Sequence, residues 1–595
     1  MNHQSRALLK GILFLVFFFL IFWQVNPTLV FHFQQLSFKW DNSLINYYLS
    51  YPGGLIEYFS IFLFQFSKFA FWGAFVYLLL AILIVYMHGV LLTSPKQNAN
   101  TILKYSLILF IAALIGNYAF PLYFLVNIFL LLTLLVVYRF FSRNIKNYSL
   151  ELIVTLVYFS MAYFLLGGGV FILFALSALL IELFQFYRVK YPIVVFIPVL
   201  TLAILLITAN VSFFISPNNS LLNFIPFGSS YKPTINVILF YALVPFSLLI
   251  QVLFTKLKTL AWQHKRLELF QYFLLIVAMV VLFWSFQNKE LKFQVEVDNL
   301  AFKGKWDKII EKVDKHPSTN RLVNFHTNRA LYHTGQMPYK LFHYPQQWGT
   351  DGLYLLHNYT SDFLLPSIQL YVDMAYTNEA IYLANELILQ KENSPQIIEQ
   401  LIVSHIIEGN YKSAMLHVNN LKKFPFFKKQ AQKYETMISS KQADEWMLKK
   451  RSFIPVTDFA ANRQSPEFDL YQLLVDHPKN KIVYEYLMSY YLLNNDMKSF
   501  FTIFPIGFNF KYDGIPRVYQ EALTYYLYKL NMEGGTIPNI KIDDEILSEF
   551  SDFISILIEF ENSAEHAKQF LTKFKNTYWY YIYFESPVTL NRKND

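Results

Sequence analysis

The 595-residue chain contains no cysteine. This absence excludes a disulfide framework, thiolate metal sites and cysteine nucleophiles. The sequence also lacks a phosphate-binding P-loop, a dinucleotide-binding glycine fingerprint and a G-x-S-x-G nucleophile motif. Its histidines do not show the spacing that is typical of zinc sites. We therefore expect neither a metal site nor a cofactor.

Acidic residues are scarce in the first half of the chain. Only five precede residue 289, namely Asp41, Glu57, Glu151, Glu182 and Glu268. The same half holds most of the apolar residues, and apolar runs of about 18 residues or more indicate membrane-spanning helices. There are nine such segments, at about residues 10–30, 70–92, 103–118, 120–139, 150–166, 169–187, 192–214, 235–255 and 269–287.

These patterns predict an all-α protein with two domains. Residues 1–288 should form a polytopic membrane helix bundle of about nine spans, with an outer loop at residues 31–69. Residues 289–595 show helical periodicity and few strand features, so they should form a soluble α-helical domain.

The lysines and arginines predict an orientation. Residues 1–288 contain 16 Lys and Arg against 5 Asp and Glu, whereas residues 289–595 have a net charge of −2. With the N-terminus inside, 13 of the 16 cations fall in inner loops or at inner helix ends, as the positive-inside rule requires. An odd number of spans then places residues 289–595 outside. In a bacterium this means an inner-membrane protein with a cytoplasmic N-terminus and a periplasmic C-terminal domain.

The cations also bear on partners. Cations close to spans lie near lipid headgroups. Membrane lipids are therefore the expected partners of the first half, and nucleic acid is not.

An internal repeat marks the second half. Ala380 and Ala414 lie 34 residues apart, which is the period of tetratricopeptide repeats. The segment from Gly409 to Pro425 resembles that repeat closely, while residues 328–342 and 489–505 look like degenerate copies. In such repeats Gly and Tyr form the turn between paired helices, and a small Ala lets the second helix approach its neighbour. The repeat-packing residues would be Ala380, Gly409, Tyr411 and Ala414.

Stacked repeats bury a continuous core and leave a concave face that can hold a protein partner. The alternative for this half is a set of helical hairpins that only pack against the membrane domain.

The loop at residues 31–69 combines two of the five acids with a sharp turn. Asp41 precedes the turn residues Tyr51, Pro52, Gly53 and Gly54, and Glu57 follows them in an apolar stretch. Proline supplies a rigid turn, and the two glycines are free to take positive φ angles. The apolar stretch predicts an interfacial helix that is continuous with the second span. The turn would bring Glu57 towards Asp41, and two close carboxylates would raise the pKa of one of them.

This layout resembles the GT-C superfamily of membrane glycosyltransferases over about 290 residues. The resemblance implies a polyprenyl-phosphate-linked sugar as donor and a catalytic acid in the first outer loop. Asp41 matches the position of that acid, and a carboxylate there can accept the proton of an acceptor hydroxyl. The sequence departs from a paired-acid motif because Asn42 follows Asp41, which puts a metal site in doubt. The alternative for Asp41 is a helix cap or a salt bridge with Lys39.

A second resemblance lies in the same loop. The YPGGL motif at residues 51–55, followed by a phenylalanine-rich stretch at residues 62–66, is similar to a family of uncharacterised bacterial multi-pass proteins. That resemblance implies the multi-pass membrane topology, and it assigns no reaction to the protein.

Other polar residues lie within the predicted spans. Glu182 is close to an inner helix end and is expected to anchor that end or to pair with Arg188, while Glu151 is expected to be interfacial. Asn127 is expected to join helices by hydrogen bonds.

Two functions follow from these features. One is an envelope glycosyltransferase that uses a lipid-linked sugar and recognises its acceptor with the repeat domain. The other is a non-enzymatic, membrane-anchored scaffold whose repeats hold a protein partner in an envelope assembly.

Overall fold

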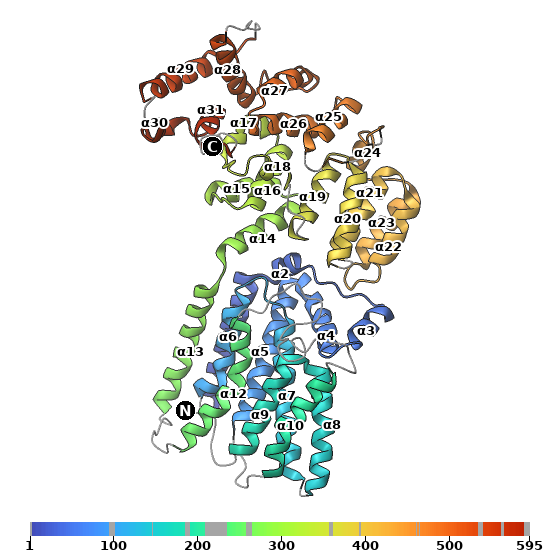
Figure 1. Cartoon of the computed structure of the whole chain (residues 1–595), viewed down its shortest axis with the longest axis vertical. Coiled ribbons are helices and arrows are strands. Elements are labelled where there is room, and N and C mark those ends of the chain that lie inside the picture. The colour runs from blue at the N-terminus through green and yellow to red at the C-terminus, as the bar shows by residue number, and fades with distance from the viewer. Residues whose placement is uncertain are drawn as a thin grey trace. The chain divides into compact units, whose positions relative to one another are not determined.

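The computed structural model describes residues 3–93, 101–145, 147–184, 191–208, 235–256, 265–355, 361–391, 394–457, 459, 461–462, 465–533, 540–560 and 564–587. These residues form helices and no strands, which confirms the predicted all-α fold (Figure 1). The chain divides into two compact units. The membrane unit comprises Met1–Lys292 with Lys423–Pro425, and the helical unit comprises Phe293–Lys422 with Phe426–Asp595.

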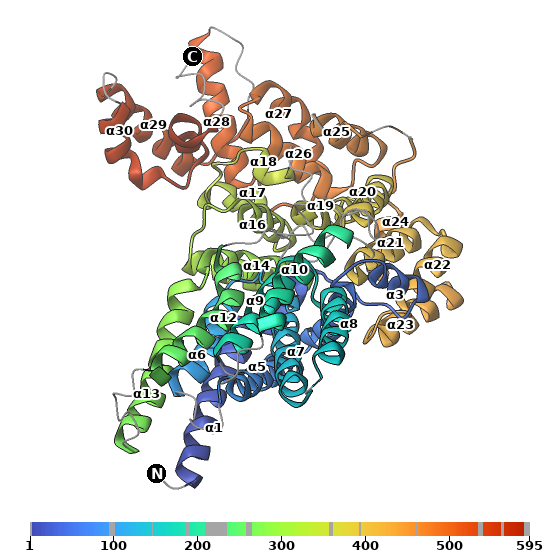
Figure 2. The same ribbon diagram turned by 60° about the horizontal axis from the view of Figure 1, so that its bottom comes forward.

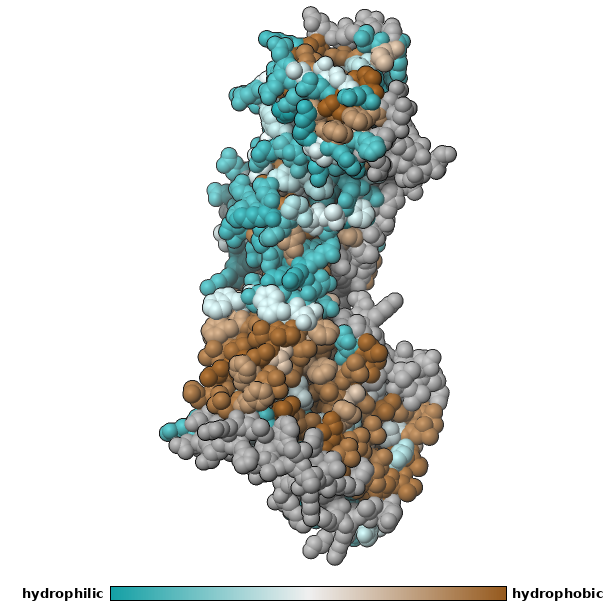
Figure 3. Space-filling view, turned by 90° about the vertical axis from the view of Figure 1, so that its left-hand side faces the viewer, coloured by the Kyte–Doolittle hydropathy of each residue, from teal (hydrophilic) through white to brown (hydrophobic). Residues whose placement is uncertain are grey.

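The membrane unit contains an apolar helix at each of the nine predicted segments. Six are long and apolar enough to cross a membrane: Ala7–Val25 (α1 His3–Phe19 with a π-helical turn), α5 (Ala70–Leu92), α7 (Tyr123–Asn144), α8 (Tyr148–Leu166), α12 (Ile235–Lys256) and α13 (Lys265–Phe286). Three described helices are shorter: α6 (Thr101–Ile115), α9 (Gly168–Phe184) and α10 (Tyr191–Ile207). Exposed apolar side chains cover this unit, whereas hydrophilic ones cover the helical unit on the face in Figure 3. The protein is therefore a helical membrane protein.

The loop between the first two long apolar helices is itself folded. It contains α2 (Pro27–Gln34), α3 (Asn42–Leu49), α4 (Gly54–Phe64) and a 3₁₀ turn at Gln65–Lys68. We call this segment, residues 27–68, the loop module. Its small core consists of Phe38, Leu44, Tyr48, Tyr51 and Ile61. The expectation that α4 continues into the next span is wrong, because the 3₁₀ turn and the extended residue Phe69 separate α4 from α5.

The helical unit consists of short helices that follow one another closely (Figure 2). The described helices are α14 (Lys289–Phe302), α15 (Trp306–Lys315), α16 (Arg321–His333), α17 (Met337–Lys340), α18 (Asp351–Tyr354), α19 (Ser361–Asp373), α20 (Thr377–Lys391), α21 (Pro395–Glu408), α22 (Tyr411–Leu421), α23 (Lys428–Ser440), α24 (Glu445–Arg451), α25 (Pro466–Asp476), α26 (Lys481–Leu493), α27 (Met497–Ile503), α28 (Arg517–Met532), α29 (Asp544–Glu559), α30 (Ala564–Phe570) and α31 (Tyr578–Tyr580). Helices α19 to α22 pack on one another in chain order.

One turn geometry recurs between paired helices of this unit. A residue with positive φ follows the first helix at Gly304, Gly335, Ala375, Gly409 and Asn495. The next residue donates its backbone N–H to the carbonyl five positions earlier, as Tyr376 does to Tyr371 (2.9 Å) and Asn410 to His405 (2.8 Å). This is the Schellman pattern of helix ends. Three of the five turns, at Gly335, Gly409 and Asn495, lie in the segments that the sequence predicts to be copies of the repeat.

Candidate functional site

The loop module rests on the membrane unit through a contact between two turns. The Gly53 N–H donates to the carbonyl of Phe164 near the end of α8 (2.8 Å). Gly167, between α8 and α9, faces the same turn, and a Cβ atom on it would lie 3.1 Å from the carbonyl oxygen of Pro52. Both glycines have positive φ angles, +85° at Gly53 and +72° at Gly167. The absence of side chains therefore lets the two backbones come close.

Gly54 has a different role from Gly53. Its φ angle is not positive, but a Cβ atom there would collide with the carbonyl oxygen of Tyr48. The expectation that both glycines take positive φ angles holds for Gly53 alone. Gly54 is instead required by the close packing of α4 against the end of α3.

Glu57 lies in the first turn of α4, directly after this turn. Its carboxylate accepts a hydrogen bond from the Tyr51 hydroxyl (2.7 Å) and interacts electrostatically with the Tyr123 hydroxyl at the start of α7. Tyr123 in turn accepts a hydrogen bond from the Asn127 side-chain amide (2.7 Å). Tyr51, Tyr123 and Asn127 are buried, while Glu57 is half-buried. We call these four residues the Glu57 cluster.

The electrostatics of the cluster keep its tyrosine donor neutral. Burial, followed by the neighbouring charge of Glu57, raises the pKa of Tyr51 well above its ordinary value. Tyr51 therefore keeps its proton and remains a donor to Glu57. A carboxylate at a helix N-terminus is also stabilised by the helix dipole.

Asp41 is a helix cap. Its carboxylate accepts hydrogen bonds from the N–H (3.1 Å) and hydroxyl (3.0 Å) of Ser43 at the start of α3. These bonds, the backbone one first, lower the pKa of Asp41 to about 2. Asp41 thus does not have the raised pKa expected of one member of a close carboxylate pair. One of the two alternatives for this residue, the cap, is the arrangement observed.

A second polar cluster lies inside the membrane unit. Glu151 in the first turn of α8 and Glu182 near the end of α9 are both buried. The Ser142 hydroxyl donates to Glu182 and lies 3.3 Å from Glu151, and Tyr138 donates to Glu182 (3.1 Å). Glu151 is 1% exposed, so its carboxylate faces the helix bundle. The two acids, from α8 and α9, thus come together at the Ser142 hydroxyl of α7.

The repeat-packing residues occupy structural positions. Ala380 and Ala414 are fully buried, in α20 and α22. The Arg451 guanidinium donates to the carbonyl of Ile406 (2.6 Å) and to the Tyr411 hydroxyl (3.0 Å), next to Gly409. These contacts close the end of α21, and they hold helices rather than a ligand.

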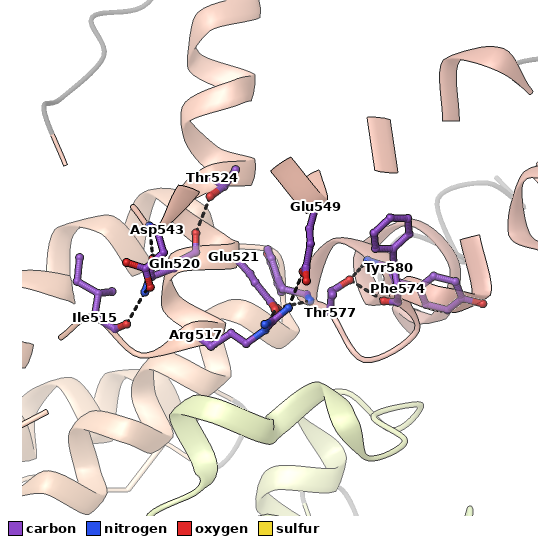
Figure 4. Close-up of polar contacts among 11 residues, drawn as sticks. Ile515, Arg517, Gln520, Glu521, Thr524, Asp543, Glu549, Phe574, Thr577 and Tyr580 are labelled. Atoms are coloured by element: carbon purple, nitrogen blue, oxygen red, sulfur yellow. Dashed lines mark hydrogen bonds and ion pairs between the residues drawn. The ribbon is translucent and has the colours of Figure 1, made fainter. Parts of the chain in front are cut away.

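The helical unit also buries an acid with a perturbed pKa (Figure 4). Glu521 in α28 accepts hydrogen bonds from Arg517 (2.9 Å) and from the backbone N–H of Tyr578 (2.9 Å), and Arg517 also pairs with Glu549. Burial raises the pKa of Glu521 to about 7, although both bonds oppose that shift. This acid fixes α28 against the segment around Tyr578.

Within the described residues, no three His, Asp or Glu side chains gather in a way that could hold a metal ion. Sequence reasoning found Glu57 and its turn, but it missed Tyr123, Tyr138 and Ser142 because a lone hydroxyl in an apolar helix has no distinguishing pattern.

Comparison with known proteins identifies the family and no activity. No curated protein and no solved structure matches the chain significantly. One family model matches residues 3–585, almost the whole length. The chain therefore belongs to DUF6057, a family of unknown function.

Proposed function

We propose that this protein is an envelope glycosyltransferase that uses a polyprenyl-phosphate-linked sugar at the outer face of a bacterial inner membrane. The observation that supports this most is the Glu57 cluster. A folded loop module fixes a half-buried carboxylate beside the ends of α7 and α8. A catalytic carboxylate must be held in a defined position by neighbouring groups. The Glu57 carboxylate is held by the Tyr51 hydroxyl.

Glu57 would act as the general base. Its carboxylate would accept the proton of the acceptor hydroxyl while that oxygen bonds to the anomeric carbon of the sugar. The bond between that carbon and the phosphate oxygen breaks, and the polyprenyl phosphate leaves with the bonding electrons. Tyr51 would orient the carboxylate through its hydrogen bond. Asp41 would contribute through α3, which it caps, and the helical unit would recognise the acceptor.

The test uses a deletion strain complemented with variants at matched expression. Envelope glycans and lipid-linked sugars would be compared by mass spectrometry. Glu57→Gln should reproduce the glycan profile of the deletion strain. Asp41→Asn and Tyr51→Phe should each restore the wild-type profile only in part. Full complementation by Glu57→Gln would overturn the catalytic proposal.

The orientation is tested separately with reporter fusions. Fusions after Gly169 and at residue 300 should report the periplasm, whereas fusions near Lys96, Ile145 and Gln263 should report the cytoplasm. Cytoplasmic signal from residue 300 would place the helical unit inside and remove its access to a periplasmic acceptor.

A scaffold remains the second candidate, and one surface favours it. Phe468, Tyr471 and Val475 follow a helical spacing along one face of α25, and they are 64%, 47% and 53% exposed. Exposed apolar stripes of this kind mark protein interaction sites. Replacing Phe468 and Tyr471 by Lys should reproduce the deletion phenotype if the protein is a scaffold, while Glu57→Gln should then behave as wild type.

A further inference from the structure

A strongly basic segment interrupts the otherwise acidic helical unit. Residues 426–451, which include α23 and α24, contain seven Lys and Arg against three Asp and Glu, a net charge of +4. Residues 289–595 as a whole have a net charge of −2. The positive charge is therefore concentrated in one short stretch of two helices, α23 and α24. A local excess of this size attracts anionic surfaces.

Internal contacts account for only part of this charge. Lys450 donates to the backbone carbonyl of Asp373, and Arg451 closes the end of α21. Two acids of the segment are paired, Glu435 with Lys422, which follows α22 (2.6 Å), and Asp444 with Lys433 (3.6 Å).

Four other lysines of the segment form no ion pair with the acids that the structure describes. They are exposed and lie beyond ion-pair distance of any acid that the structure describes: Lys428, Lys429, Lys441 and Lys449. Their charge is available to a partner.

Large apolar side chains are interleaved with these cations. Phe426, Trp446 and Leu448 are 44%, 43% and 46% exposed. Cations together with exposed Trp, Phe and Leu are typical of surfaces that insert into the headgroup region of a bilayer. A surface for a soluble polyanion has no need of exposed leucine, so the mixture favours lipid over nucleic acid.

The chain also keeps the helical unit near a bilayer. The last long apolar helix, α13, ends at Phe286, and α14 begins at Lys289. A connection this short gives a surface on the helical unit a high effective concentration at the membrane.

We propose that residues 426–451 form a peripheral docking surface for the anionic phospholipid headgroups of the bilayer that holds the membrane unit. Lysines near such a surface each contribute favourable electrostatic energy, and Trp446 and Leu448 would enter the headgroup region. This inference does not depend on the proposed transferase activity.

The test exploits the absence of cysteine. Leu448→Cys in the full-length protein provides a single site for an environment-sensitive fluorophore, and the labelled protein is reconstituted in nanodiscs. Nanodiscs that contain phosphatidylglycerol should shift the emission to the blue relative to nanodiscs of phosphatidylcholine alone. High salt should reverse the shift, because the Debye length falls from about 10 Å at 0.1 M to about 3 Å at 1 M.

Two charge variants decide between this surface and a general effect of charge. Replacing Lys428, Lys429, Lys441 and Lys449 by Glu should abolish the shift. The matched control replaces four exposed lysines elsewhere in the helical unit, Lys308, Lys479, Lys498 and Lys511, and should retain it. An equal shift in both lipids, loss of the shift in the control, or a shift produced by soluble heparin and not by phosphatidylglycerol would overturn the proposal.

Discussion

The loop module and the helical unit both turn the chain at glycine, but they need glycine for different reasons. In the loop module, Gly54 allows α4 to pack against the Tyr48 carbonyl, and any Cβ atom would collide there. In the helical unit, a Cβ atom on Gly409 would meet no atom closer than 3.8 Å, so this position only requires a positive φ. Ala375 and Asn495 adopt the same turn without glycine. A position where any Cβ atom would collide accepts only glycine, whereas an unfavourable φ angle lowers the free energy of unfolding by a limited amount.

The largest expected effect tests the steric side of this comparison. Gly54→Ala should reduce the free energy of unfolding by roughly 3 kcal/mol or more, because the opposing atom is backbone and cannot move aside. Thermal unfolding in detergent would measure the loss. Gly11→Ala is the control, since its Cβ would meet no atom within 4 Å. Equal stability of the two variants would show that the α3–α4 turn is not closely packed.

The next prediction concerns the pH dependence of stability, and it follows from the raised pKa of Glu521. The pKa of Glu521 is raised from 4.5 to about 7 by burial. Below pH about 4.5 the group is protonated in both folded and unfolded states, and above about 7 it is ionised in both. Stability should therefore fall as pH rises through this window, by up to roughly 3 kcal/mol.

Glu521→Gln has no proton to lose and should remove that fall. Urea unfolding of the two proteins at pH 5 and pH 8 would compare them. Parallel pH profiles for wild type and Glu521→Gln would contradict the burial of this carboxyl.

A smaller effect is expected at the contact between α21 and α22. Ala414 is fully buried, and Ala414→Trp should overpack this contact at a cost of roughly 1–3 kcal/mol. Leu416→Trp, on the same helix at a position that is 71% exposed, should change stability little. If Leu416→Trp were the more harmful, the face that α22 buries would be different from the one described.

The smallest effect tests the conformational side of the comparison. Gly409→Ala should cost about 1 kcal/mol, since alanine fits the space and only the left-handed conformation opposes it. The reciprocal change is Lys441→Gly, because Lys441 ends α23 with a φ of +54°. It should stabilise the protein by a similar amount in the same thermal assay. A cost at Gly409 as large as that at Gly54 would erase the distinction between the two turns.

Much of the fold could be predicted because its determinants are local. Each apolar segment became a helix, since hydrophobic length and helical hydrogen bonding are properties of a continuous stretch. Ala380 and Ala414, on which the predicted repeat rests, are both fully buried in helices. The break between α4 and α5 was not predictable from hydropathy, because the 3₁₀ turn at Gln65 depends on hydrogen bonds from the Gln65 side chain to Leu36 and Ile61.

The candidate site was predictable only in part. The loop acids and the Pro-Gly-Gly turn were visible, and a helix cap was one of the alternatives for Asp41. Nothing near Tyr123 in the sequence distinguished it from the many other tyrosines. Its electrostatic interaction with Glu57 joins residues 66 positions apart, and only packing brings them near each other.

The sequence by itself determined that the chain is helical, that its first half is suited to a bilayer, and that its second half forms a separate series of helices. Composition and periodicity suffice for these, because each residue's preference for lipid, water or a turn acts over a few neighbours. Tertiary structure decided which polar groups interact. Glu57 interacts electrostatically with Tyr123, and the Ser142 hydroxyl links Glu151 to Glu182. Burying a polar group is favourable only with a partner, and the partner comes from another helix whose position no local pattern encodes.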